Sequence, residues 1–234
     1  MTAVFKREFG AYFTSPLGYV FVAIFYFFSG AFFYLFTLSS KSTDISMVFV
    51  GMFYVMGIFI PVLTMRLMAD DRKQKTDQLT LTAPISLVRL VCGKFLAAFA
   101  IFAIGVLIMF FYGIVLSFFA DINWPMIFGN VVGMILIGAV FIAAGIFISA
   151  LTENQMIAAV GAIGLNIVFL LIDSLATVIP FEFISNILSA LAFYSKYYEF
   201  TIGLFSISSI LYFVSVIVIF LFLTIRVLEK RRWA

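Results

Sequence analysis

The stretch 122–152 reads INWPMIFGNVVGMILIGAVFIAAGIFISALT and contains no Asp, Glu, Lys or Arg. A charged side chain costs about 2.5–3.5 kcal/mol at the centre of a membrane helix, so charges mark the ends of membrane spans. An uncharged apolar run of about 18 residues or more is long enough to cross a bilayer as a helix. The stretch therefore predicts one transmembrane helix, and the same rule applies along the whole chain.

Five further runs between successive charges exceed this length: 9–40, 45–65, 95–120, 154–172 and 200–225. The next longest run, 183–195, is too short to cross as a helix. Of the 234 residues, 65% are hydrophobic and 11% are charged, with a mean hydropathy of +1.23, which leaves too little polar surface for a water-soluble fold. We therefore expect a single all-α membrane domain, 1–234, with six transmembrane helices and both termini on one side.

The positions of Lys and Arg predict the orientation of the chain, because these residues gather on the cytoplasmic side of a membrane. With both termini in the cytoplasm, only Lys41 and Lys196 of the 14 basic residues lie outside. The inside group is Lys6, Arg7, Arg66, Arg72, Lys73, Lys75, Arg89, Lys94, Arg226, Lys230, Arg231 and Arg232. This bias predicts a multi-pass protein of the cytoplasmic (inner) membrane. The net charge of +3 is then a topology signal, and we expect no nucleic-acid partner.

The first 16 residues have the pattern of a short amphipathic helix. Phe5, Phe9 and Tyr12 fall on one side, and Ser15-Pro16 breaks the helix before the first span. We interpret segment 1–16 as an anchor in the cytoplasmic interface; a lever that moves with a partner is the alternative. Residues expected at the membrane interface are Lys6, Arg7, Trp124, Lys196, Arg231, Arg232 and Trp233.

Segment 66–90 is the most hydrophilic part of the chain. From Asp70 to Lys75 every residue is charged except Gln74. Strong helix formers fill the segment up to Leu79, and Thr82-Ala83-Pro84 ends it, so we expect a cytoplasmic helix. The next cytoplasmic connection, 152–155, is so short that the fourth and fifth spans must form an antiparallel hairpin.

Two patterns outside the cytoplasmic loops also predict structure. In segment 176–200, apolar and polar side chains gather on opposite sides of a helical wheel over 180–198, which predicts one amphipathic helix that lies in or dips into the outer leaflet. In the fourth span, the pairs Gly129/Gly133 and Gly145/Ser149 have the spacing of close helix packing. We expect that packing to be within the chain, and a dimer seam is the alternative.

Several chemistries have no residues to support them. The sequence contains no His, one Cys, no Gly-x-Ser-x-Gly motif and no Gly-x-x-x-x-Gly-Lys-Ser/Thr motif. We therefore expect no enzyme activity, no metal site and no bound cofactor. The predicted spans carry no central ionisable residue that could couple transport to an ion gradient. The polar segment 66–90 then remains as the place where a cytosolic motor could dock, with an ordinary solvated loop as the alternative.

Three stretches resemble permeases of the type-2 ABC exporter superfamily, also called type V, and most of all the gliding-motility-type branch. Stretch 70–84 matches the family's coupling helix, Glu-Glu-Arg-x-x-Gly-Thr-Leu-Glu-Leu-Leu-Leu-Thr-x-Pro, at Arg72, Thr76, Leu79, Leu81, Thr82 and Pro84. Gly93-Lys94-Phe95 is similar to the start of the family's third span, and 149–159 to its second cytoplasmic turn. The sequence departs from the family form at Lys75, where Gly is usual, at Asp77 and at Gln78.

The resemblance covers nearly the whole chain and implies the permease subunit of an exporter for an unidentified substrate. ATP and Mg would be bound by separate cytosolic ATPase subunits, and a second permease subunit, identical or related, would complete the path through the lipid. The resemblance also leaves room for an extracytoplasmic accessory protein. It implies an ATPase-coupling role for Asp70, Asp71, Arg72, Lys73, Lys75, Thr76, Asp77, Gln78, Glu153, Asn154 and Gln155. A subunit that transmits motion or anchors an ATPase without moving solute, and an ion-coupled carrier, remain alternatives.

Overall fold

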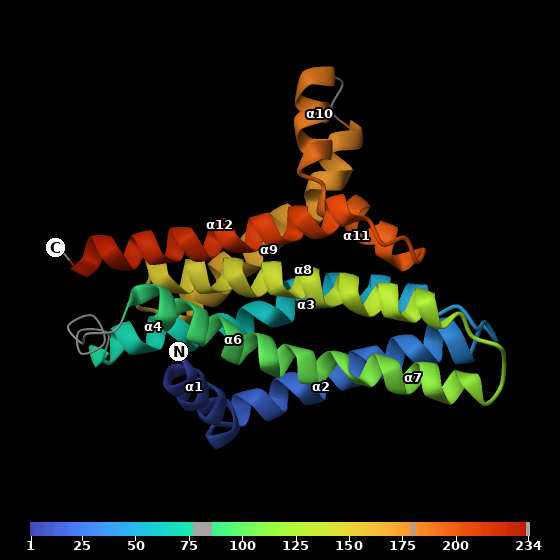
Figure 1. The fold of residues 1–234 in the computed structure, drawn as a ribbon, viewed down its shortest axis with the longest axis horizontal. Coiled ribbons are helices and arrows are strands. Elements are labelled where there is room, and N and C mark those ends of the chain that lie inside the picture. The colour runs from blue at the N-terminus through green and yellow to red at the C-terminus, as the bar shows by residue number, and fades with distance from the viewer. Residues whose placement is uncertain (77–85, 179–180, 233–234) are drawn as a thin grey trace.

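The computed structural model describes residues 1–76, 86–178 and 181–232, and this part of the chain is helical throughout, with short connections and no strand (Figure 1). The helices are α1 (Thr2–Thr14), α2 (Pro16–Phe32), the π-helix η1 (Phe33–Leu38), α3 (Ser46–Thr64), α4 (Arg66–Lys73), α6 (Leu87–Val106), α7 (Ile108–Ser117), α8 (Trp124–Leu151), α9 (Gln155–Val178), α10 (Glu182–Ala190), α11 (Phe193–Thr201) and α12 (Ile207–Arg232). The expected all-α fold is confirmed.

Six helical segments of the described residues are long and apolar enough to cross a membrane: Pro16–Leu38, Ser46–Lys73, Leu87–Ser117, Trp124–Leu151, Gln155–Val178 and Ile207–Arg232. They follow the order of the six uncharged runs, so the six predicted spans are confirmed. Both termini, α4 and the α8–α9 turn lie at one end of the bundle, which we call the base (Figure 1).

The central helix of the bundle is α8. In its most apolar window 72% of the residues are buried inside the protein, against 11% for α12 and 28% for α9. Its glycines allow this, because a side chain there would clash with a neighbour: Gly133 with Phe200 of α11, and Gly145 with Thr64 of α3. Close packing of these glycines within the chain is therefore confirmed.

A proline interrupts the backbone hydrogen-bond pattern of α3. Pro61 has no N–H, so the carbonyl of Gly57, one turn earlier, loses its partner within the helix. An unpaired carbonyl is costly in hydrocarbon. The side chain of Asn166, fully buried on α9, supplies the missing donor through an Nδ2···O hydrogen bond of 3.0 Å to Gly57. Asn166 thus joins α9 to the weak point of α3.

The C-terminal half of α9 and α10 form a hairpin that projects sideways from the bundle (Figure 1). The Ser185 hydroxyl donates to the carbonyl of Ala176 at 2.8 Å, across the hairpin. Val178 and Phe183 are 77% and 78% exposed. The apolar surface of this hairpin is therefore available to lipid.

The single amphipathic helix expected over 180–198 is wrong, because α10 ends at Ala190 and α11 begins at Phe193. The physical reason is a cap supplied from another helix. The carboxylate of Asp173 on α9 accepts hydrogen bonds from the backbone N–H groups of Tyr194 at 2.9 Å and Ser195 at 2.8 Å. These N–H groups are in the first turn of α11, where a helix has no internal partners for them.

Candidate functional site

The polar helix α4 continues from α3 after a single turn residue, Met65, and is anchored to the central helix by Ser149. The buried Ser149 hydroxyl donates to the carbonyl of Met65 at 2.8 Å and accepts from the N–H groups of Met68 and Ala69, both at 3.1 Å. The first N–H groups of a helix need such a partner, which a serine oxygen commonly provides. The serine that the sequence assigned to helix packing therefore also fixes the direction of α4.

The outward side of α4 is tied to the α8–α9 turn. Arg72 forms an ion pair of 2.7 Å with Glu153. Gln155 donates from Nε2 to a carboxylate oxygen of Asp70 at 2.9 Å. Two loops that the sequence assigned to the same role, although about 80 residues apart, are therefore in direct contact in the fold.

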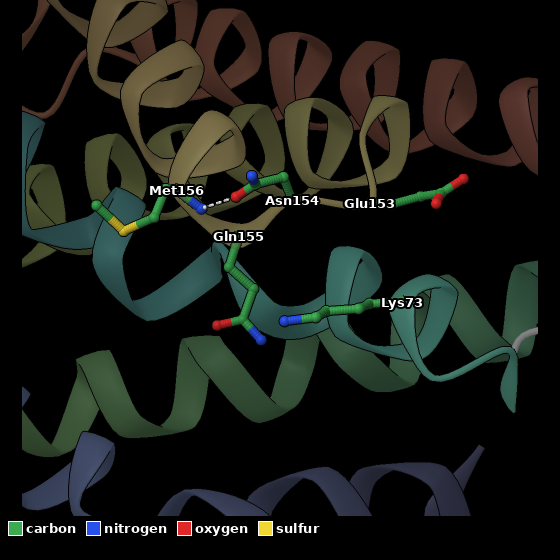
Figure 2. A pocket seen from close by; sticks show the side chains of 5 residues that line it. All are labelled: Lys73, Glu153, Asn154, Gln155 and Met156. Atoms are coloured by element: carbon green, nitrogen blue, oxygen red, sulfur yellow. Dashed lines mark hydrogen bonds between the residues drawn. The ribbon is translucent and has the colours of Figure 1, made fainter.

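A pocket of about 300 Å³ opens between these two segments (Figure 2). It is lined by Lys73, Glu153, Asn154, Gln155 and Met156. Lys73 and Gln155 point toward one another across it, while Glu153 points away, and Asn154 accepts a hydrogen bond of 2.9 Å from the N–H of Met156. The pocket thus presents an ammonium group and amides at an exposed surface, a composition that suits contact with a polar surface of another protein.

The helix expected to run on to Leu79 is wrong in part, because α4 ends at Lys73. Lys75 has a φ of 57°, in the left-handed region that side chains other than glycine rarely adopt. This is the position where the resembling family usually has glycine. Thr76 is described and donates from its hydroxyl to the carbonyl of Asp71 at 3.1 Å, whereas Asp77 and Gln78 lie outside the described residues.

Asp71 differs from its neighbours because it points into the protein. Its carboxylate lies 2.7 Å from the ammonium of Lys94, which also contacts Glu8 at 3.0 Å, and Arg7 lies 3.9 Å away. Lys94 is 1% exposed. If charges mark the ends of spans, the third span is predicted to start at residue 95. In the structure α6 starts at Leu87, so Lys94 lies about two turns inside the helix.

Comparison of the sequence with protein families gives a match over almost the whole chain. The family described as ABC-2 family transporter protein matches residues 2–233. The chain belongs to the ABC-2 transporter family. A search of curated proteins finds no match. This ABC-2 protein is thus a multi-pass membrane protein of a family whose members are membrane subunits and are not themselves ATPases.

Four of the interface residues predicted for this ABC-2 protein lie on helices at the base. Lys6 and Arg7 are exposed on α1, Arg231 donates a hydrogen bond to the carbonyl of Ala150, and Arg232 is exposed. Trp233 lies outside the described residues. Depth in a membrane stays a prediction for all of them.

Two further predicted interface residues lie toward the opposite end of the bundle. Trp124 is half-buried at the start of α8, and its ring packs where a side chain on Gly113 of α7 would be. The Lys196 ammonium lies 4.9 Å from the ring centre of Tyr212, a cation–π contact. Both residues therefore join neighbouring helices.

Sequence reasoning missed the role of Arg66, which joins the start of α4 to the end of α1 at the base. Arg66 donates to the Ser15 hydroxyl at 2.8 Å, and the buried Tyr12 hydroxyl donates to the carbonyl of Leu63, also at 2.8 Å. Burial raises the pKa of Tyr12, so this hydroxyl stays protonated. Ser15-Pro16 was visible as a break between helices, but the partners of Tyr12 on α3 and of Ser15 on α4 are too distant in sequence to be found from local patterns.

Proposed function

We propose that this chain is the permease subunit of an ATP-driven exporter of the gliding-motility-type branch. Its base faces the cytoplasm of the inner membrane, where a separate ABC ATPase holds ATP and Mg. The match to the ABC-2 family over residues 2–233 supports the permease role. The excess of Lys and Arg in the connections at the base supports the orientation.

One observation carries the docking site: α4 and the α8–α9 turn form a joined polar surface. The Arg72–Glu153 and Asp70–Gln155 contacts hold the two segments together, and Lys73 lines the pocket between them. An ATPase that binds here contacts the second and fourth spans at once. Because Ser149 fixes α4 to α8, displacement of α4 would be passed to the central helix.

The proposal includes a second permease subunit, identical or related, beside this one. Six spans are few for a transport path, and α8, the most buried of them, is packed inside the chain. The path would then run between two subunits. The substrate is unassigned, and an extracytoplasmic accessory protein would contact the end opposite the base.

Purification from native membranes in mild detergent tests the partner directly. We expect an ABC ATPase to copurify, with ATPase activity that rises when both proteins are placed together in vesicles. The informative variant is the exchange Arg72→Glu with Glu153→Arg, which keeps the internal ion pair but reverses the charges that the surface presents. It should insert and melt normally yet bind the ATPase about tenfold more weakly, a loss of about 1.4 kcal/mol.

Asp121→Lys is the matched control, because it reverses an exposed charge at the opposite end of the bundle. Equal binding by the exchange variant and the control would contradict the docking site. Solute uptake by the pure chain, free of ATPase and driven by an ion gradient, would point to a carrier. A bound and stimulated ATPase without solute movement would point to a subunit that transmits motion.

A further inference from the structure

A cluster of four charged residues joins three helices at the base. Lys94 of α6 contacts Glu8 of α1 at 3.0 Å and Asp71 of α4 at 2.7 Å, and Arg7 contacts both carboxylates at 2.5 and 3.9 Å. The two positive and two negative charges balance. The cluster lies on the side of α4 that faces α1 and α6, whereas the surface that we propose for the ATPase lies on the side that faces the α8–α9 turn.

Lys94 is the centre of the cluster because all three of its N–H donors have a partner. Besides the two carboxylates, the ammonium donates to the carbonyl of Leu67 in α4. The side chain is 1% exposed, so water cannot replace a lost partner. A buried ammonium without its carboxylates is strongly unfavourable. Helices α1 and α4 therefore cannot move away from α6, or from each other, while Lys94 stays charged and buried.

A second set of contacts links α1 to the same region. Arg66, the first residue of α4, donates to the Ser15 hydroxyl at the end of α1, and Tyr12 of α1 donates to Leu63 of α3. Directly after Ser15, Pro16 starts α2, the first span, with a fixed φ angle. The chain thus offers a continuous path of contacts from α4 through α1 to α2.

We propose that Lys94 is a positioning residue that makes α1, α4 and the base of α6 move as one body. This inference rests on the proposed function, because the movement starts when the ATPase displaces α4. Displacement of α4 then carries α1 with it, and the bend at Ser15-Pro16 passes the movement to the first span. Helix α1 is a lever in this mechanism, where the sequence favoured a simple anchor.

The variant that tests this is Glu8→Gln with Lys94→Met. It removes one negative and one positive charge, so the remaining Arg7 and Asp71 still balance, and Met is close to Lys in length. Replacing a buried ion pair by uncharged groups of similar volume usually preserves folding. The control, Arg226→Met with Glu229→Gln, removes an exposed ion pair of 2.8 Å from α12.

Spin labels at two exposed positions give the readout. Cys92 is the single cysteine of the chain, so Cys92→Ser provides a background without thiols for Lys6→Cys on α1 and Lys230→Cys on α12. The distance between the labels is measured in the complex with the copurified ATPase, with and without a non-hydrolysable ATP analogue. We expect the nucleotide to change this distance in the labelled parent and in the control, and to change it less than half as much in Glu8→Gln/Lys94→Met, while the ATPase stays bound.

The outcomes separate the two proposals. An unchanged distance in the parent with the ATPase bound, or the same change in the parent and the cluster variant, overturns the role of Lys94 and leaves the docking site standing. If no ATPase copurifies with the parent, the proposed function fails and this inference fails with it.

Discussion

The base and the projecting α9–α10 hairpin are held together in different ways. At the base, Ser149 and Lys94 join helices whose residues are far apart in the sequence, and each makes three hydrogen bonds or ion pairs in a buried place. In the hairpin, the Ser185 hydroxyl bonds to a carbonyl only nine residues away, and Phe183 is mostly exposed. Polar bonds fix the base, while the hairpin depends on its surroundings.

This difference indicates where rigidity is needed. Polar bonds in a water-poor place have strict geometry, so a base built on them keeps its helices in one arrangement. Apolar contacts with lipid have no such geometry, because one acyl chain can replace another. The base is therefore suited to pass on a displacement, and the hairpin to tolerate one.

Replacing Ser149 by Ala should have the largest effect on stability. The change leaves one buried carbonyl and two N–H groups without their shared partner, at a cost of about 2 kcal/mol. Ser189→Ala in the exposed hairpin removes only bonds to carbonyls of its own helix and should cost less than about 0.5 kcal/mol. Unfolding in detergent, followed by circular dichroism, measures both; equal losses would remove the contrast between the two regions.

A double-mutant cycle at Asn166 and Pro61 tests the boundary between the regions, where α9 leaves the bundle. Asn166→Leu removes the donor for the Gly57 carbonyl and should cost about 1 kcal/mol. In a Pro61→Ala background the restored N–H takes over this carbonyl, so the same change should cost less. The free energy of unfolding of the four proteins gives the coupling. Additive effects would show that Asn166 does not compensate for the proline.

The smallest effect is expected where the backbone itself is strained. Lys75 at the base and Lys41 in the connection at the other end have φ angles of 57° and 51°. Glycine at either position should raise stability by about 0.5 kcal/mol, because it adopts this conformation without a steric penalty. Lys73→Gly, at the last residue of α4, should lower it by less than about 1 kcal/mol, the cost of glycine in a helix interior. Thermal midpoints in detergent measure the three variants; a loss at Lys75 would mean that its side chain matters more than its φ angle.

The six spans could be predicted because the cost of burying charge acts on each residue separately. Uncharged runs, the break at Ser15-Pro16 and the short turn before Gln155 are all local features; the runs match the number and order of the spans, and the break and the turn match helix ends in the structure. The end of α4 could not be predicted, because helix propensity favours its continuation through Lys75. The break between α10 and α11 depends on Asp173, which comes from another helix.

Contacts between helices far apart in the sequence also limited the prediction of the candidate site. The sequence assigned Asp70, Arg72 and Glu153 to one surface, and the fold brings them together. It also treated Asp71 as an outward charge and Lys94 as the end of a span, although the two are turned toward each other inside the protein. A hydropathy pattern records that a residue is charged; which opposite charge neutralises it depends on how helices meet.

The central position of α8 also bears on the biogenesis of the protein. The partners that cover its outer glycines and Phe147, Phe200 of α11 and Phe220 of α12, are synthesised after it. Because chains enter the membrane from the N-terminus onward, these surfaces of α8 stay exposed to lipid until α11 and α12 have been synthesised. A nascent chain that stops before α12 would expose them to the membrane's quality-control proteases, so burial of the central helix depends on synthesis of α12.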